Sequence, residues 1–239
     1  MTCDAGPTSM QVRDLGQISY AEALSLQREL NEAVIAGDAP PTLLLLEHDP
    51  VITISRRKSA REHLLASPDR LAAMGIDVQE TDRGGDITYH GPGQLVAYPI
   101  LPLQRYNLNL SRYMRLLEQI VIDTLLRFNI AAHRVPGDTG VWVPTTPKPQ
   151  APPPPMEAKI CALGVRIRKH VTMHGLALNV TANLDHFATI VPCGLVGRPV
   201  TSLHQLLADA TPPMAEVKAA LTQTFHHHLA EPIEPTAPK

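Results

Sequence analysis

Hydrophobic and polar positions in the first part of the chain predict one helix followed by short strands. Apolar residues recur at helical spacing over 19–36, where Ser19 and Glu22 form a capping-box pattern and Gly37 interrupts the repeat. The run 42–47 is almost wholly apolar, which indicates a strand buried on both faces. Shorter strands are expected at 11–15 and 51–55, and a basic loop at 56–61.

The rest of the chain contains more strand patterns than helix patterns. Helical spacing returns over 111–129, which Asn109 or Ser111 can cap, and over 214–229. Pro99 and Pro102 place the strand 94–101 at a sheet edge or put the prolines at its end. Further strands are expected at 76–79, 86–90, 159–167 and 175–180. Strands follow one another more often than they alternate with helices, so the pattern predicts an α+β fold, a single domain with a mixed sheet and covering helices.

Three segments lack the large apolar residues that build a core. Residues 1–10 are small and polar, and residues 230–239 are rich in proline, so both are expected to be flexible tails. A proline-rich stretch at 144–158 is expected to be an exposed loop. We therefore expect one folded domain over 11–229.

Composition and charge exclude several classes of protein. The 239 residues are 44% apolar but only 4% aromatic, so the core must be mainly aliphatic. Lys plus Arg number 21 and Asp plus Glu number 23, a balance that argues against nucleic-acid binding and against a polybasic membrane anchor. No apolar run is long enough to span a bilayer, and the first residues lack a signal-peptide pattern, so we expect a cytoplasmic protein.

The cysteines are the first candidates for chemistry. Their odd number fits reduced thiols better than a disulfide framework. Cys3 lies in the expected tail, and Cys161 lies within an apolar strand pattern, where a small buried side chain is the usual outcome. Cys193 stands between Pro192 and Gly194, a sequence that permits either a structural turn or an exposed nucleophile.

A nucleophilic cysteine needs a nearby cation or base that favours its thiolate. Candidate partners are Lys159, His90 and His174, although a single lysine is usually a solvated surface residue. The adjacent histidines at 226–228 do not share one helix face, so we interpret them as a solvated helix end and expect no metal site.

A glycine-rich segment from Arg83 to Tyr98 reads RGGDITYHGPGQLVAY. Glycines let a backbone approach a ligand closely, although a hairpin with glycine turns is the simpler interpretation of Gly84-Gly85 alone. The whole segment resembles the signature of the lipoyl(octanoyl) transferases. The resemblance extends from about residue 11 to 225 and includes 44–51, 61–65, 140–143, 159–164, 174–179, 190–194 and 200–203.

The resemblance implies a role for each matching residue. Cys193 matches the family's acyl-thioester cysteine, and Lys159 matches the lysine that favours its thiolate. The fold would resemble the catalytic domain of biotin and lipoate ligases, and no cofactor or metal would be needed. The substrate-binding positions would be Arg83, Gly84, Gly85, Asp86, Ile87, Thr88, Tyr89, His90, Ala162, Leu163, Gly164, Gly175, Leu176 and Ala177.

The implied activity is the first step of endogenous protein lipoylation. The donor would be octanoyl-acyl carrier protein, and the acceptors would be lysines on lipoyl domains of 2-oxoacid dehydrogenase E2 subunits and on the glycine cleavage H protein. Octanoyl would pass through a Cys193 thioester, without ATP, in a monomer. Leu163 and Leu176 would line the acyl tunnel, and backbone N–H groups near Cys193 or in the glycine-rich strands would bind the oxyanion.

Three alternatives remain open at this point. An ATP-dependent lipoate or biotin ligase would need no Cys193, a hydrolase would pair Cys193 with His90 or His174, and a binding module would need no reactive residue. The chain also departs from the family pattern in its proline-rich loop, in Cys161 where alanine is common, and at 53–55.

Overall fold

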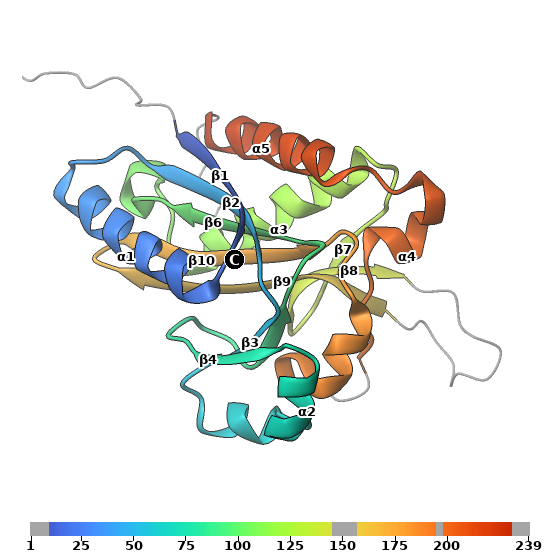
Figure 1. Cartoon of the computed structure of the whole chain (residues 1–239). Coiled ribbons are helices and arrows are strands. Elements are labelled where there is room, and N and C mark those ends of the chain that lie inside the picture. The colour runs from blue at the N-terminus through green and yellow to red at the C-terminus, as the bar shows by residue number, and fades with distance from the viewer. Residues whose placement is uncertain (1–9, 145–156, 195–197, 231–239) are drawn as a thin grey trace, which may run out of the picture.

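The computed structural model describes residues 10–144, 157–194 and 198–230 of the chain (Figure 1). In this part of the chain, no helix is long and apolar enough to cross a membrane.

Two mixed sheets form the framework of the described residues. The larger has seven strands in the spatial order β1 (Gln11–Ile18), β2 (Thr42–His48), β6 (Gln94–Ile100), β10 (Val171–Asn179), β9 (Glu157–Arg168), β8 (Asp138–Pro144) and β7 (His133–Val135). The smaller has three, in the order β4 (Asp77–Glu80), β3 (Val51–Ile54) and β5 (Thr88–His90). β1 pairs with β2 and β3 with β4 in parallel, and the other pairs are antiparallel.

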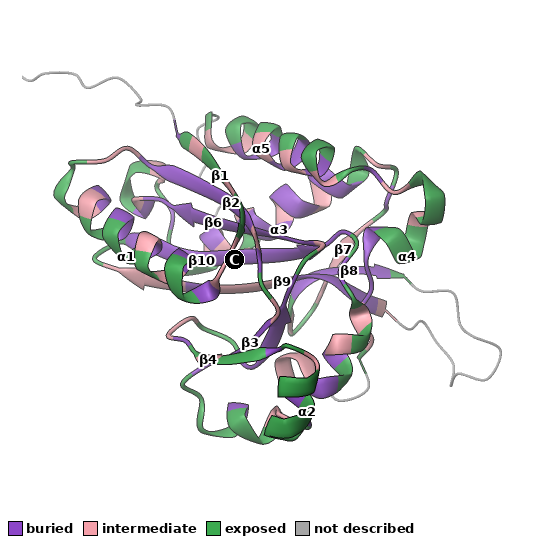
Figure 2. Cartoon of the chain, in the orientation of Figure 1, coloured by how far each residue is buried: buried purple, intermediate pink, exposed green. Residues whose placement is uncertain are grey.

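Helices cover both faces of the larger sheet (Figure 1). Helix α1 (Tyr20–Ala36) packs on one face, and α3 (Leu110–Leu126) packs on the other, with α5 (Met214–Ala230) against α3. Side chains alternate along β2, so Leu44 and Leu46 contact the α1 side while Leu43 and Leu45 contact the α3 side. Figure 2 shows the resulting buried strands between helices with exposed outer faces. The short helices α2 (Pro68–Ala73) and α4 (Leu203–Leu207) lie outside this arrangement.

The helix ends follow the sequence signals. Ser19 Oγ accepts a hydrogen bond from the Glu22 N–H, and Gly37 takes a left-handed φ of 83° after α1. Asn109, rather than Ser111, caps α3, because its side chain accepts from the Arg112 N–H at 2.9 Å. These contacts confirm the helices predicted at 19–36 and 111–129, the second of which ends three residues early.

The prediction of an edge position for 94–101 is wrong, because β6 lies between β2 and β10. Proline is tolerated near its end because the pairing of β6 with β10 stops at Ala97, before Pro99. The Thr172 hydroxyl then donates to the Pro99 carbonyl at 2.5 Å. The alternative placement of the prolines, at the strand's end, is therefore confirmed.

Other predicted boundaries also shift. The first strand continues to Ile18, the basic loop becomes a 3₁₀ turn at Lys58–His63, and β7, β8, α2 and α4 were not expected. β4 and β5 do not form a hairpin, because each pairs with β3. The proline-rich loop is shorter at its ends than predicted, since Pro144 ends β8 and Glu157 opens β9. The rest of that loop, and the predicted tails apart from Met10 and Ala230, lie outside the described residues.

Candidate active site

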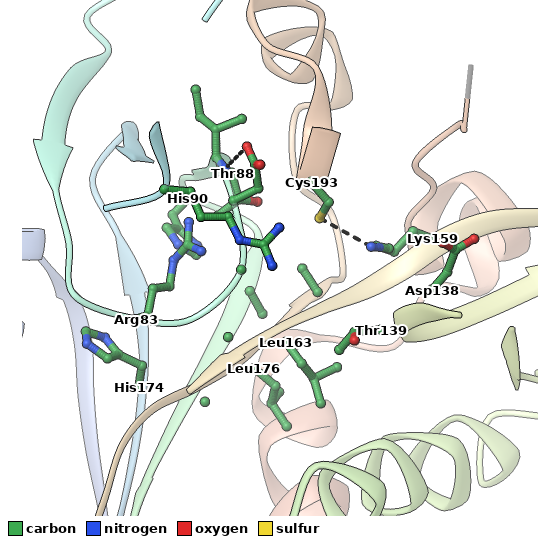
Figure 3. A pocket seen from close by; sticks show the side chains of 18 of the residues that line it. Arg83, Thr88, His90, Asp138, Thr139, Lys159, Leu163, His174, Leu176 and Cys193 are labelled. Carbon is green, nitrogen blue, oxygen red and sulfur yellow. Dashed lines mark hydrogen bonds between the residues drawn. The ribbon is translucent and has the colours of Figure 1, made fainter. Parts of the chain in front are cut away.

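A pocket of about 270 Å³ lies between the two sheets. Strands β9 and β10 form one wall, and β5 with the 83–87 loop forms another. The 3₁₀ turn Pro192–Gly194 brings Cys193 to the same pocket (Figure 3). Residues far apart in the sequence therefore meet in one cavity.

Cys193 is held in a conformation that non-glycine residues rarely adopt. Its φ is 57°, in the left-handed region. Its N–H donates to the Ile87 carbonyl at 3.1 Å, and the Gly194 N–H donates to the Val191 carbonyl at 3.0 Å. These bonds keep the turn in place and leave the thiol partly exposed at the pocket wall. Such strain is typical of residues whose position serves a site.

Lys159 is the hydrogen-bonding partner of this thiol. Its Nζ lies 3.2 Å from Cys193 Sγ, and the residue is only 6% exposed (Figure 3). Its main chain is fixed on both sides, because its N–H donates to Pro199 O at 2.9 Å and its carbonyl accepts from the Thr201 N–H at 3.0 Å. A buried ammonium beside a thiol favours the thiolate form.

The two histidines considered as partners have other contacts. His90 Nδ1 lies 2.7 Å from Gln94 Oε1, and His174 Nε2 lies 2.9 Å from Asp82 Oδ1. Burial lowers the pKa of His174 to about 3 and that of His90 well below its ordinary value. Both rings are therefore neutral near pH 7, and neither is hydrogen-bonded to Cys193 among the described residues. The arrangement does not favour a Cys–His pair.

Arg83 is anchored inside the pocket rather than extended to solvent. Its guanidinium donates to the Thr53 carbonyl at 3.0 Å, the Thr53 hydroxyl at 2.9 Å and the Gly84 carbonyl at 3.1 Å. Burial lowers its pKa. A Cβ on Gly164 would lie 2.9 Å from Gly84 O and 3.0 Å from Arg83 Cδ, so the 83–87 loop can approach β9 this closely only because residue 164 is glycine.

Asp86 links this loop to the turn that carries Cys193. Its Oδ1 accepts from the Ile87 N–H at 2.7 Å and lies 2.7 Å from His63 Nδ1. A Cβ on Gly194 would lie 2.8 Å from His63 Cε1. His63 was not assigned a role from the sequence, although it lies in the matching segment 61–65.

Most of the positions predicted to bind substrate do line the pocket. Gly84 and Tyr89 do not. Tyr89 faces the other side of β5, where its hydroxyl lies 2.7 Å from His186 Nδ1 and its ring packs against Phe187. Burial there raises its pKa to about 12. The predicted residues that line the pocket are Arg83, Gly85, Asp86, Ile87, Thr88, His90, Lys159, Ala162, Leu163, Gly164, Gly175, Leu176, Ala177 and Cys193.

Several lining residues were not identified as such from the sequence. They come from α1, β6, the turn before β8, the first residues of β8 and the basic segment after β3, and the sequence assigned none of them a role in binding. They are Tyr20, Arg57, Tyr98, Gly137, Asp138 and Thr139, with His174, which was considered only as a partner for cysteine.

The pocket combines a reactive end with an apolar wall. Leu163 on β9 and Leu176 on β10 are direct neighbours in the sheet register, as are Ala162 and Ala177. Together they offer apolar surface of the kind that a hydrocarbon chain contacts. Within the described residues, no group of three His, Cys, Asp or Glu side chains is placed to hold a metal ion.

Comparison with known proteins gives one family and one fold. Residues 19–226 match the family model described as the lipoyl protein ligase A/B catalytic domain. The chain is 43% identical over 222 residues to an octanoyltransferase of Geobacter metallireducens, covering 93% of this chain and 94% of the relative. It is 47% identical over 214 residues to an octanoyltransferase of Chloroflexus aurantiacus, covering 89% and 91%.

Solved structures share the fold at much lower sequence identity. A bipartite lipoate protein ligase of Thermoplasma acidophilum superposes with a TM-score of 0.68 at 20% identity, covering 93% of this chain and 84% of that one. A biotin protein ligase of Aquifex aeolicus, in complex with biotin and ATP, superposes with a TM-score of 0.55 at 14% identity, covering 92% and 70%. The predicted ligase-like α+β fold is thereby confirmed.

Proposed function

Because this chain belongs to the lipoyl protein ligase A/B catalytic-domain family, we propose that it transfers octanoyl through a thioester on Cys193, with Lys159 as the acid and base. It is an acyltransferase that transfers an octanoyl group in protein lipoylation. The observation that carries the proposed mechanism is the 3.2 Å contact between Lys159 Nζ and Cys193 Sγ at the wall of the pocket.

In the first step the Cys193 thiolate attacks the carbonyl carbon of an octanoyl thioester. The new C–S bond forms on Cys193 while the bond to the donor sulfur breaks. The Lys159 ammonium gives its proton to the departing thiolate, so the donor leaves as a thiol. The acyl chain lies along the apolar wall that Leu163 and Leu176 form.

In the second step an acceptor amine attacks the same carbonyl carbon. The bond to Cys193 breaks, and the neutral Lys159 amine takes the proton that the nitrogen loses. Thiolate and ammonium are restored, and the product is an amide. Because a thioester is converted into an amide, this step is downhill and needs no ATP.

We take the proposed donor and acceptors from the family resemblance. The donor is octanoyl-acyl carrier protein, and the acceptors are lipoyl domains of 2-oxoacid dehydrogenase E2 subunits and of the glycine cleavage H protein. The names of the curated relatives support the octanoyl group. The Thermoplasma ligase, described together with its E2 lipoyl domain, supports the class of acceptor by likeness of fold.

One of the two expected sets of oxyanion donors, the N–H groups near Cys193, is already engaged in hydrogen bonds. The N–H groups of Cys193 and Gly194 already donate to main-chain carbonyls, so they would have to exchange those bonds in order to bind the oxyanion. The Lys159 ammonium is a donor that already points at the reacting sulfur. We therefore propose that this ammonium is the main group that stabilises the negative charge of the tetrahedral intermediate.

Intact-protein mass spectrometry tests the thioester. Wild type, Cys161→Ser and Cys193→Ser are each mixed with octanoyl-acyl carrier protein in the absence of ATP. Wild type and Cys161→Ser should gain one octanoyl group that hydroxylamine removes, and Cys193→Ser should gain none. Adding a lipoyl domain should then move the group to a lysine of that domain.

Two results would contradict the proposal. An adduct that persists in Cys193→Ser and that neutral hydroxylamine still removes places the thioester elsewhere. Transfer that appears only with ATP and free octanoic acid assigns the chain a ligase mechanism instead, since an adenylate would then activate the acid.

A further inference from the structure

The position of the Lys159 ammonium requires an explanation. Lysine carries its charge on a flexible four-carbon side chain, so a contact of 3.2 Å with Cys193 is kept only if the ammonium is held from another side. In the part of the chain that the structure describes, no carboxylate forms an ion pair with Lys159. The ammonium is nevertheless buried, since Lys159 is 6% exposed.

The indole of Trp142 supplies the missing contact. Trp142 pairs with Lys159 in the register of β8 and β9. The Lys159 Nζ lies 4.7 Å from the centroid of the ring, within the range of a cation–π interaction. Trp142 is wholly buried, so this interaction is shielded from water. The ammonium is therefore held between an aromatic face and the thiol.

The ring itself is fixed by two further contacts. Its Nε1–H donates to the Asp138 carbonyl at 3.2 Å. The Arg198 guanidinium carbon lies 5.4 Å from the ring centroid, and Arg198 Nη2 lies 2.9 Å from Asp138 Oδ2. Asp138 lines the pocket beside Lys159 (Figure 3), but its carboxylate is paired with Arg198. Asp138 is thus not available to draw the Lys159 ammonium away from Cys193.

We propose that Trp142 is a positioning residue of the octanoyl transfer, which acts by holding the Lys159 ammonium against the Cys193 thiol. This inference rests on the proposed function only for the role of Lys159. The ring favours the charged form of lysine, and the charged lysine favours the thiolate. Loss of the ring should therefore reduce the reactivity of Cys193 without any loss of the cysteine or the lysine.

Other charges also face Cys193, and they must stay unchanged in the test. Arg83 interacts electrostatically with Cys193 from across the pocket, and Asp86 and His63 lie beside Gly194. On the other side of β9, the Glu118 carboxylate interacts electrostatically with Cys161, which lies two residues from Lys159. A substitution at Trp142 removes no contact that the structure gives to these groups, although it does remove the ring on which Arg198 packs.

Alkylation of Cys193 by iodoacetamide measures the effect directly. The rate is followed as a function of pH in wild type, Trp142→Phe and Trp142→Leu. Trp142→Leu should move the profile to higher pH by roughly half to one pH unit, which is roughly a three- to tenfold slower reaction near neutral pH. Trp142→Phe keeps an aromatic face and should recover part of the rate. Single-turnover octanoylation should fall in the same order through its rate constant, with little change in donor KM.

Two control variants distinguish positioning of the Lys159 ammonium from a general effect of Trp142 on packing. In Lys159→Met the ammonium is gone, so adding Trp142→Leu should shift the profile no further. Phe225→Leu removes another wholly buried aromatic ring, from α5 and away from the pocket. Like Trp142→Leu, it should lower the melting temperature, but it should leave the alkylation profile of Cys193 unchanged.

The sole tryptophan of the chain supplies an independent readout. Its fluorescence should differ between wild type and Lys159→Met, because the substitution removes the cation at its face. An unchanged emission, an unshifted alkylation profile in Trp142→Leu, or an equal shift in the Lys159→Met background would each overturn the role of Trp142. If Lys159→Met itself left Cys193 reactivity unchanged, the proposed role of Lys159 would fail together with this inference.

Discussion

Two described cysteines of the same chain occupy opposite chemical environments. Cys193 lies at the pocket wall beside an ammonium. Cys161 is instead wholly buried among the apolar side chains that pack between the larger sheet and α3. Burial raises the pKa of the Cys161 thiol, because the thiolate loses its hydration there. A thiol two residues from the key lysine is therefore kept unreactive by its surroundings.

Differential alkylation checks this contrast. In native protein, iodoacetamide should modify Cys193 while Cys161 stays unmodified, because the reactive thiolate of Cys161 is suppressed and the atom is inaccessible. Peptide mass spectrometry locates the modified residue, and denatured protein serves as the control in which both react. Equal labelling of the two in native protein would contradict the buried assignment.

Substitution of Lys159 separates its two proposed roles. Lys159→Met should reduce acylation of Cys193 by roughly a hundredfold to ten-thousandfold, the usual value of a positioned proton donor or acceptor. Lys159→Arg keeps a cation but cannot take up a proton, so it should form acyl-enzyme slowly and then retain it in the presence of acceptor. Rapid-quench mass spectrometry measures both steps.

The exposed Lys169, in the turn between β9 and β10, provides the matched control. Lys169→Met should acylate and transfer at the wild-type rate. If Lys159→Arg transferred octanoyl to the acceptor as fast as wild type, Lys159 would not be the base of the second step.

At the scale of elements, the site depends on how closely β8 and β9 approach. Gly140 on β8 has a φ of 128°, and a Cβ there would lie 2.8 Å from Cys161 O and 3.1 Å from Lys159 Cε. The Glu118 carboxylate of α3 accepts the Gly140 N–H at 3.2 Å and pairs with Arg115 and Arg134. Helix α3 thus fixes the strand against which the Lys159 side chain lies.

Gly140→Ala should therefore affect both stability and catalysis. We expect a loss of roughly 1–3 kcal/mol in the free energy of unfolding, from backbone strain, together with a fall in kcat because the methyl group displaces Lys159. Urea unfolding and steady-state transfer measure the two effects. Gly16→Ala shares a positive φ, 61°, but its Cβ would meet no atom within 4 Å, so it should cost stability without lowering kcat. An unchanged kcat in Gly140→Ala would show that Lys159 is not displaced.

At the scale of the whole molecule, buried histidines join the elements around the pocket. His48, at the end of β2, donates through Nδ1 to Ile18 O at 3.0 Å and accepts at Nε2 from the Tyr98 hydroxyl at 2.8 Å. Its ring also packs against Tyr20 and His90. Burial lowers the pKa of His48 to about 4, so the folded protein holds this ring neutral.

Stability should consequently fall on mild acidification. An unfolded chain protonates His48 near its ordinary pKa of about 6.5. The folded chain resists protonation until about pH 4. The contribution of His48 to the free energy of unfolding is therefore complete above about pH 6.5. It is lost as the pH falls towards 4, at up to about 1.4 kcal/mol per pH unit.

Urea unfolding at a series of pH values measures this loss. His48→Gln should be less stable than wild type at neutral pH but should lose less stability on acidification. His170→Gln, at an exposed position, should keep the wild-type slope. If the free energy of unfolding of His48→Gln fell with pH as steeply as that of wild type, groups other than His48 would cause the acid sensitivity.

Local patterns in the sequence determined most of the elements of this protein, and the resemblance of its motifs to one family predicted the candidate reactive residues. The helix at 19–36 follows from its cap and apolar spacing, and β2 follows from its apolar run, because both depend on neighbouring residues alone. The motif around Cys193 and the lysine near the start of β9 were likewise recognisable from the resemblance. Of the fourteen positions predicted to bind substrate, twelve line the pocket.

Only the tertiary structure decided which of these residues meet and what surrounds them. In it β6 lies inside the sheet and Tyr89 faces away from the pocket. Lys159, rather than His90 or His174, contacts the Cys193 thiol. The tertiary structure also brought Trp142 beneath the Lys159 ammonium. The physical reason is that strand order and register join segments distant in the chain, and the burial that sets a side chain's charge and reactivity exists only after those segments have packed.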